Sequence, residues 1–306
     1  MRAFIFPGQG SQSVGMGAAL AGASRVAREL FEEVDEALGQ NLFRLMTEGP
    51  IDDLTLTENA QPAIMANALA TLRASGIQIG KADFVAGHSL GEYSALAAAG
   101  SFDVATTARL LKLRGQAMQR SVPVGEGAMA ALLGATLEVA QAVADAAAEG
   151  EVCTVANDND PSQVVISGHK GAVERALGIA KEKGAKRALL LPVSAPFHSP
   201  LMAPAAREME QALADAKLRA PAVPLYANVT AAPVSEPDEI RRLLVEQVTG
   251  MVRWRESVAA MAEAGVTHFV EFGGKVLAPM VKRIAPDARV TSVVTMEEID
   301  ALVKEI

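Results

Sequence analysis

Ser89 is the side chain in this sequence that is best placed for nucleophilic chemistry. It stands in the motif GHSLG, residues 87–91, after a strand-like run and before a helix-forming run. This order is typical of a nucleophile elbow, in which a tight turn exposes the serine hydroxyl and the helix start directs free N–H groups toward it. Because Gly-x-Ser-x-Gly also occurs by chance, the alternative is a small residue that packs where a strand meets a helix. The flanking elements favour the nucleophile.

Serine needs a base to act as a nucleophile at neutral pH, and the sequence offers four histidines. His88 adjoins the serine, but neighbours along a turn point apart, so we interpret it as a supporting contact. His169 lies at a predicted helix start, and His268 lies inside a predicted strand, which is typical of a satisfied core residue. His198 is the best candidate, because it precedes a predicted helix start, where the imidazolium form is disfavoured.

No acidic residue completes a Ser-His-acid triad in an obvious way. Asp158 and Asp160 lie between Ser89 and His198 in the chain, but the segment around them, ANDNDPS, predicts a turn. We therefore expect a Ser-His dyad whose histidine is oriented by an acceptor other than a carboxylate.

An α/β fold must position these residues. Helices alternate with short apolar strands along most of the chain, which predicts a mostly parallel sheet with helices on both faces. Over residues 125–194 the predicted order changes to β-α-β-β-α-β, the signature of a ferredoxin-like unit. We therefore predict a hydrolase-like large domain, discontinuous over residues 1–124 and 195–306, into which a ferredoxin-like subdomain is inserted. A cleft between the two is a usual place for a site.

Three local predictions accompany this fold. Residues 18–38 are expected to form one helix, and residues 61–76 are expected to form an amphipathic helix. Ser199 is expected to cap a helix whose first position is Pro200.

Composition argues against several classes of function. A net charge of −8 argues against nucleic-acid binding, and no apolar run reaches the roughly 18 residues that span a membrane. No metal-ligand spacing such as CxxC or HExxH occurs, so no metal site is expected. The single cysteine, Cys153, rules out an intrachain disulfide, and we expect a buried thiol in a cytoplasmic protein.

The glycine-rich segment PGQGSQSVGMG, residues 7–17, does not fit a nucleotide-binding loop. Ser13 stands where Gly-x-Gly-x-x-Gly needs its third glycine, and Met16 stands where a P-loop needs lysine. The glycines instead indicate a loop whose backbone N–H groups approach another group closely.

Four motifs in order resemble the malonyl-CoA:acyl carrier protein transacylase family, over essentially the whole chain. They are FPGQGSQ (6–12), GHSLGEYSALAAAG (87–100), RGQAMQ (114–119) and PVSAPFHSPLM (192–202). The resemblance implies that Ser89 carries the malonyl ester and that His198 acts as general base and then as general acid. It also implies an oxyanion hole made by the backbone N–H groups of Gln9 and Leu90.

The same resemblance suggests the residues that recognise the substrate. Arg114 would bind the malonyl carboxylate, Gln247 would orient His198 through its backbone carbonyl, and Asn157 would line the cleft. Phe197 resembles the bulky residue of malonyl-selective members, and we expect it to crowd an α-methyl branch. Without the resemblance, Arg114 would be interpreted as a solvated cation and Gln247 as a surface residue.

One segment departs from the family's pattern. The chain has FGGKVL at 272–277, one residue short of the family's Gly-Pro-Gly-Lys turn. That turn carries none of the chemistry implied above.

The resemblance implies a ping-pong transfer of malonyl from malonyl-CoA to the phosphopantetheine thiol of acyl carrier protein in fatty-acid synthesis. We expect a monomer without a permanently bound cofactor. A docking patch for the acidic carrier protein is expected at the basic residues Lys181, Lys183, Lys186 and Arg187, which a solvated helix end explains equally well. The alternatives are a discrete acyltransferase of polyketide synthesis, a serine thioesterase or esterase, and a non-catalytic carrier-protein-binding module.

Overall fold

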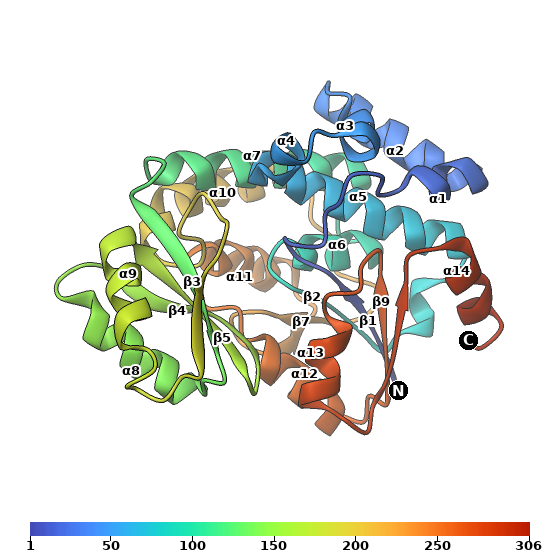
Figure 1. Cartoon of the computed structure of the whole chain (residues 1–306). Coiled ribbons are helices and arrows are strands. Elements are labelled where there is room, and N and C mark those ends of the chain that lie inside the picture. Colours follow the sequence, from blue (N-terminus) through green and yellow to red (C-terminus); the bar gives the residue numbers. More distant parts are fainter.

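The structure, a computed structural model that describes residues 1–306, contains two β-sheets (Figure 1). The strands of the larger sheet are β1 (Arg2–Phe6), β2 (Phe84–Gly87), β7 (Leu225–Ala227), β8 (Ala232–Val234), β9 (His268–Phe272) and β10 (Arg289–Val293). Their order is β10-β9-β1-β2-β7-β8, and only β8 runs antiparallel to its neighbour. The predicted α/β fold with a mostly parallel sheet is confirmed.

Helices cover both faces of this sheet, because its buried strands alternate their side chains between the faces. In β1, Phe4 and Phe6 pack into the main hydrophobic cluster, whereas Ala3 and Ile5 pack on the opposite face with Trp254. No helix of the fold is both long and apolar enough to span a bilayer. The helices around this sheet are α1 (Ala18–Ala23), α2 (Arg25–Leu38), α3 (Leu42–Glu48), α4 (Ile51–Thr55), α5 (Thr57–Ser75), α6 (Gly91–Ala98), α7 (Val104–Ser121), α10 (Ala203–Asp215), α11 (Pro237–Thr249), α12 (Trp254–Glu263), α13 (Ala278–Ile284) and α14 (Met296–Val303).

The smaller sheet is antiparallel and lies beside the larger one, with its helices on the outer side (Figure 1). Its strands are β3 (Gly127–Leu133), β4 (Cys153–Asp160), β5 (Gln163–His169) and β6 (Arg187–Leu190), and its helices are α8 (Leu137–Ala148) and α9 (Lys170–Ile179). The strand order is β4-β5-β3-β6, which confirms the predicted β-α-β-β-α-β unit. The division of the chain into domains at residues 125 and 194 stays a prediction.

The helix predicted over residues 18–38 is wrong, because two helices occupy this segment. Ser24 has extended backbone angles, φ −125° and ψ 116°, and its hydroxyl accepts the N–H of Ala27. A serine that bonds the backbone in this way starts a new helix rather than continuing the old one.

One further local prediction is wrong, and another is confirmed only in part. The helix over residues 61–76 is not amphipathic, since α5 is buried on nearly every side between α2, α7 and the large sheet. Ser199 is the N-cap residue of a short 3-10 turn, Pro200–Met202, which starts with Pro200 and leads directly into α10. Its hydroxyl makes no capping bond and donates to the carbonyl of Pro196 instead.

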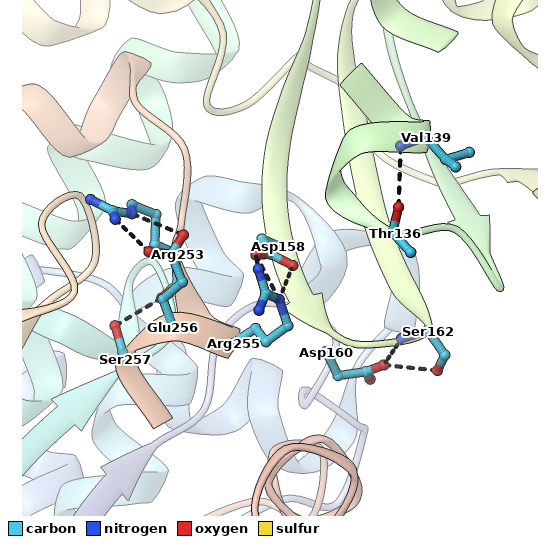
Figure 2. A network of polar contacts seen from close by, with 9 residues as sticks. All are labelled: Thr136, Val139, Asp158, Asp160, Ser162, Arg253, Arg255, Glu256 and Ser257. Atoms are coloured by element: carbon cyan, nitrogen blue, oxygen red, sulfur yellow. Dashed lines mark hydrogen bonds and ion pairs between the residues drawn. The ribbon is translucent and has the colours of Figure 1, made fainter. Parts of the chain in front are cut away.

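The expected turn at ANDNDPS is also wrong, because β4 continues through Asp160 and both aspartates are buried. Asp158 accepts two hydrogen bonds from Arg255 of α12, at 2.9 and 3.0 Å (Figure 2). Asp160 forms an ion pair with Arg283 of α13 at 2.8 Å. The Asp158 N–H also donates to the carbonyl of Val252 at 2.9 Å. These contacts fasten the smaller sheet to the helices of the larger one.

Candidate active site

Ser89 lies on the tight turn between β2 and α6 that its motif predicts. Its φ of 53° lies in the left-handed region that side chains other than glycine rarely adopt. A Cβ at Gly87 would lie 1.9 Å from the carbonyl oxygen of Gly91, and a Cβ at Gly91 would lie 2.3 Å from that of Phe6. Only glycine therefore fits at either position, and the turn holds the serine just beyond the carboxyl end of β2.

Asn228, which sequence reasoning missed, holds this turn in place through two hydrogen bonds to its backbone. Its Oδ1 accepts the N–H of Ser89 at 2.8 Å, and its Nδ2 donates to the carbonyl of Gly87 at 2.8 Å. Asn228 is fully buried just after β7. The polar residue that follows the strand-like run PLYA was the available signal.

The structure places His198 against Ser89, with Ser89 Oγ 2.7 Å from His198 Nε2. On the other side of the ring, Nδ1 lies 2.8 Å from the backbone carbonyl of Gln247. A carbonyl can only accept, so Nδ1 carries the proton and the Nε2 lone pair faces the serine hydroxyl. Burial, helped by the charge of Arg114, lowers the pKa of His198 to about 3, so the ring is neutral near pH 7. The acceptor is thus a backbone oxygen rather than a carboxylate.

Gln9 and Leu90 both line the pocket in front of Ser89. The backbone N–H of each makes no hydrogen bond within the protein. The loop that carries Gln9 packs closely on the elbow, since a Cβ at Gly8 would lie 2.7 Å from the carbonyl oxygen of His88. Two unpaired backbone donors beside a serine hydroxyl can stabilise a negative oxygen that develops there.

Arg114 is not the solvated cation that its helix alone suggested. Its side chain is only 1% exposed, and its Nη2 lies 3.2 Å from Ser89 Oγ. The same nitrogen donates to Gln247 Oε1 at 2.8 Å, and Nη1 donates to Gln61 Oε1 at 2.8 Å. Gln61 was missed by sequence reasoning because it lies within the buried helix α5. The pocket therefore holds one guanidinium next to the Ser89 hydroxyl.

Gln247 is buried, so the surface interpretation is wrong for this residue as well. Its side-chain Nε2 donates to the carbonyl of Ser89 at 3.0 Å and to the carboxylate of Glu92 at 2.8 Å. One residue of α11 therefore contacts Ser89, His198 and Arg114. Glu92 is a further site residue that sequence reasoning missed.

The cavity in front of these residues has a volume of about 260 Å³ and lies between the two sheets. Seven of the eight residues singled out in the sequence line it, and Gln247 lies directly behind them. Phe197 contributes to its apolar wall, and Asn157, on β4, faces it with a buried side-chain oxygen that has no partner. Further apolar lining comes from Met118, Met129, Leu191 and Val193.

The remaining histidines are not within reach of Ser89 Oγ. His88 is bonded to Asn159 Oδ1 at 2.7 Å, and burial lowers the pKa of its ring. His169 stands before α9 and accepts the N–H of Val152, while His268 is half-buried and bonded to Thr291.

Two predictions concern residues outside the pocket, namely the buried cysteine and the basic docking patch. Cys153 is buried as expected, and desolvation raises the pKa of its thiol to about 11. The four basic residues of the expected docking patch are exposed and make no ion pair, namely Lys181, Lys183, Lys186 and Arg187. No group of three or more His, Cys, Asp or Glu side chains is arranged to hold a metal ion.

Comparison with known proteins finds similarity over the whole length of the chain. A family model described as the acyl transferase domain matches residues 3–282. The malonyl CoA-acyl carrier protein transacylase of Bacillus subtilis (strain 168) is 44% identical, over 99% of this chain and 96% of that protein. The crystal structure of acyl-carrier-protein-S-malonyltransferase from Bartonella henselae is 51% identical with a TM-score of 0.97, covering 99% of this chain and 98% of that one.

One similar structure contains a bound protein. It is a malonyl-transacylase in complex with its type II polyketide synthase acyl-carrier protein, 39% identical with a TM-score of 0.96. The match covers 100% of this chain and 99% of that one.

Proposed function

The chain belongs to the malonyl-CoA:acyl carrier protein transacylase family, and we propose that Ser89 carries the malonyl group between the two thiols. Its activity is that of an acyl-carrier-protein S-malonyltransferase. The observation that carries the proposed site is the buried guanidinium of Arg114, 3.2 Å from Ser89 Oγ. A hydrolase for neutral esters has no use for a buried cation at this position, whereas an acyl group that ends in a carboxylate does.

The first half-reaction forms the malonyl ester. Ser89 Oγ attacks the thioester carbonyl of malonyl-CoA while His198 Nε2 takes the hydroxyl proton. The N–H groups of Gln9 and Leu90 stabilise the oxyanion. As the C–S bond breaks, His198 returns the proton to the CoA sulfur, and malonyl-Ser89 remains.

The second half-reaction uses the same groups in reverse. The pantetheine thiol of acyl carrier protein gives its proton to His198 and attacks the carbonyl of the ester on Ser89. The C–O bond breaks, Ser89 recovers its proton, and the malonyl thioester leaves on the carrier protein. Because His198 has a pKa of about 3, it is available as a base throughout the neutral range.

Two residues of the pocket support a preference for the malonyl group, one at its carboxylate and one at its α-carbon. Arg114 can pair with a carboxylate through two parallel hydrogen bonds, which favours malonyl over acetyl. We expect Phe197, which is 8% exposed in the pocket wall, to disfavour an α-methyl branch.

Acyl carrier protein and malonyl-CoA are the substrates. We propose fatty-acid synthesis as the pathway, a monomeric cytoplasmic enzyme with no bound cofactor, and carrier-protein docking at the basic patch 181–187. The complex of a similar transacylase with its carrier protein supports a direct protein contact.

Intact-mass measurement tests this function. Incubation with malonyl-CoA should add one malonyl group to the protein, and phosphopantetheinylated acyl carrier protein should then remove it. Ser89→Ala should give no adduct, whereas Ser94→Ala, at a buried serine on the next helix outside the pocket, should retain it. An adduct on Ser89→Ala, or release to water at the same rate without carrier protein, would overturn the proposal.

A further inference from the structure

Arg114 is a buried cation without a directly bonded carboxylate. None of the ion pairs in the structure includes it, and its acceptors are the amide oxygens of Gln61 and Gln247 and the hydroxyl of Ser89. Burial of a charge without an opposite charge nearby is strongly unfavourable. The site should therefore contain a negative group that balances Arg114 in the free enzyme.

Glu92 is a buried carboxylate that no cationic side chain contacts directly. It lies on the first turn of α6 and is 1% exposed. Its Oε2 accepts the N–H of Asn228 at 3.1 Å and the Nε2 of Gln247 at 2.8 Å, but no cationic side chain bonds to it. A single amide, that of Gln247, separates this anion from Arg114.

We propose that Glu92 is the counter-ion of Arg114 and a positioning residue for malonyl recognition, which acts through the bridging amide of Gln247 and takes up a proton when a malonyl carboxylate enters the pocket. This inference rests on the function proposed above and adds a proton-linked partner to the same site.

The amide of Gln247 has only one orientation that satisfies its neighbours. Its Nε2 faces three oxygens, those of the Glu92 carboxylate, the Ser89 carbonyl and the Asn228 amide, while its Oε1 faces the donor of Arg114. A flipped amide would set an N–H group against the guanidinium and an oxygen against three oxygens. The carboxylate of Glu92 thus fixes the acceptor that holds Arg114 beside Ser89.

The charge balance changes when malonyl arrives. Burial raises the pKa of Glu92 to about 7, and its bonds to Gln247 and Asn228 and the charge of Arg114 limit that rise. Once the malonyl carboxylate pairs with Arg114, a second anion has entered the site, so the pKa of Glu92 rises further. Glu92 then takes a proton from solvent and becomes a neutral carboxylic acid.

No other group in the site follows this titration near neutral pH. Arg114 of α7 is the charged group that acts on Glu92, and the neighbouring Tyr93 has its pKa raised to about 12. Burial lowers the pKa of the His88 ring, and that of His198 lies at about 3, well below the neutral range. Because binding is coupled to proton uptake, malonyl recognition should strengthen as the pH falls through about 7.

The ratio of kcat/KM for malonyl-CoA to that for acetyl-CoA, measured from pH 6 to pH 8, tests the coupling. The titrations of CoA and of the common catalytic groups cancel in this ratio. In the unmodified enzyme it should fall roughly 3- to 10-fold from pH 6 to pH 8. Glu92→Gln keeps an acceptor for Gln247 but removes the charge, so its ratio should be flat. Glu271→Gln, at a buried carboxylate that bonds only to Ser292 and to the N–H groups at the start of α13, should retain the slope.

A second measurement needs no variant. Acylation of the unmodified enzyme by malonyl-CoA at pH 7, in weak buffer with an indicator dye, should take up as much as about half a proton per site, because Glu92 with a pKa of about 7 is half ionised beforehand, and acylation by acetyl-CoA should take up none. A flat ratio in the unmodified enzyme, the same slope in Glu92→Gln, or malonylation without proton uptake would overturn the inference. Intact mass of the same samples separates the two levels. An absent adduct contradicts the proposed function, whereas an adduct without uptake contradicts only the role of Glu92.

Discussion

Two regions of this molecule bury arginine and carboxylate charge, and they pair it in opposite ways. Where β4 meets α12, Asp158 is paired directly with Arg255, whose side chain is 34% exposed while that of Asp158 is 1% exposed (Figure 2). In the active site, Arg114 and Glu92 are both buried and share the amide of Gln247 instead of each other.

The difference separates a structural contact from a binding site. Asp158 is bonded directly to a cation that water still partly solvates, so this pair fixes one element against another. Arg114 is held by the amide oxygens of Gln61 and Gln247 and by the hydroxyl of Ser89. A malonyl carboxylate can replace such partners without breaking an ion pair, which keeps the positive charge available.

The largest effect should come from removal of Arg114, the cation that no carboxylate contacts directly. Arg114→Ala should lower kcat/KM for malonyl-CoA about 100-fold or more, ~3 kcal/mol, because a charge-assisted contact is lost and Gln61 and Gln247 keep unpaired oxygens. Activity toward acetyl-CoA should fall far less. Steady-state kinetics with both substrates measure this, with thermal unfolding as a check on folding.

Arg120→Ala is the matched control, since it removes an exposed arginine near the end of the same helix, where it pairs with Glu208. It should leave the preference for malonyl unchanged. Equal losses for malonyl-CoA and acetyl-CoA in Arg114→Ala would remove the distinction between the two charged regions.

The next effect concerns stability rather than selectivity. Arg255→Ala leaves Asp158 buried without its partner, and should lower the free energy of unfolding by about 2 kcal/mol, less than for a fully buried pair because Arg255 is partly solvated. The double variant Asp158→Ala/Arg255→Ala should recover part of this loss. Urea unfolding gives both values. A change in malonyl preference as large as that in Arg114→Ala would contradict a purely structural role.

The same comparison shows what the sequence alone can predict. GHSLG needs only its flanking strand and helix to indicate an elbow, because a nucleophile turn is local, and the β-α-β-β-α-β order likewise depends on neighbours in the chain. Burial of Arg114 and Gln247 depends on partners such as Gln61 and Glu92 from other elements. Helical periodicity holds no information on those partners, so local reasoning placed both residues at the surface.

The turn predicted around Asp158 was wrong for the same reason. An Asn- and Asp-rich segment favours a turn when only local bonding is considered. The partners that keep β4 extended, Arg255 and the carbonyl of Val252, come from a segment about a hundred residues later in the chain. Wherever a buried charge is satisfied by a distant residue, the local pattern predicts the wrong environment, and this holds for both charged regions.

A smaller effect should come from the apolar wall. Phe197→Ser should raise the rate with methylmalonyl-CoA relative to malonyl-CoA by about 5- to 30-fold, ~1–2 kcal/mol, because a methyl group contributes only this much in an apolar pocket. Competition between the two substrates, read by intact mass, measures the ratio. Unchanged discrimination would assign the selectivity to Arg114 and its partners alone.

The smallest effect should come from charges that are solvated. Lys183 is exposed and unpaired, and an exposed ion pair with an acidic partner contributes at most about 1 kcal/mol. Lys183→Glu should therefore raise the KM for acyl carrier protein about 2- to 5-fold, more at low salt than at high salt. Malonylation of Ser89 by malonyl-CoA should not change. Lys304→Glu, a matched change beside α14, should alter neither step. Equal KM values for the two variants would move the docking surface away from residues 181–187, while a slower acylation in Lys183→Glu would show that this patch acts on the pocket and not only on the carrier protein.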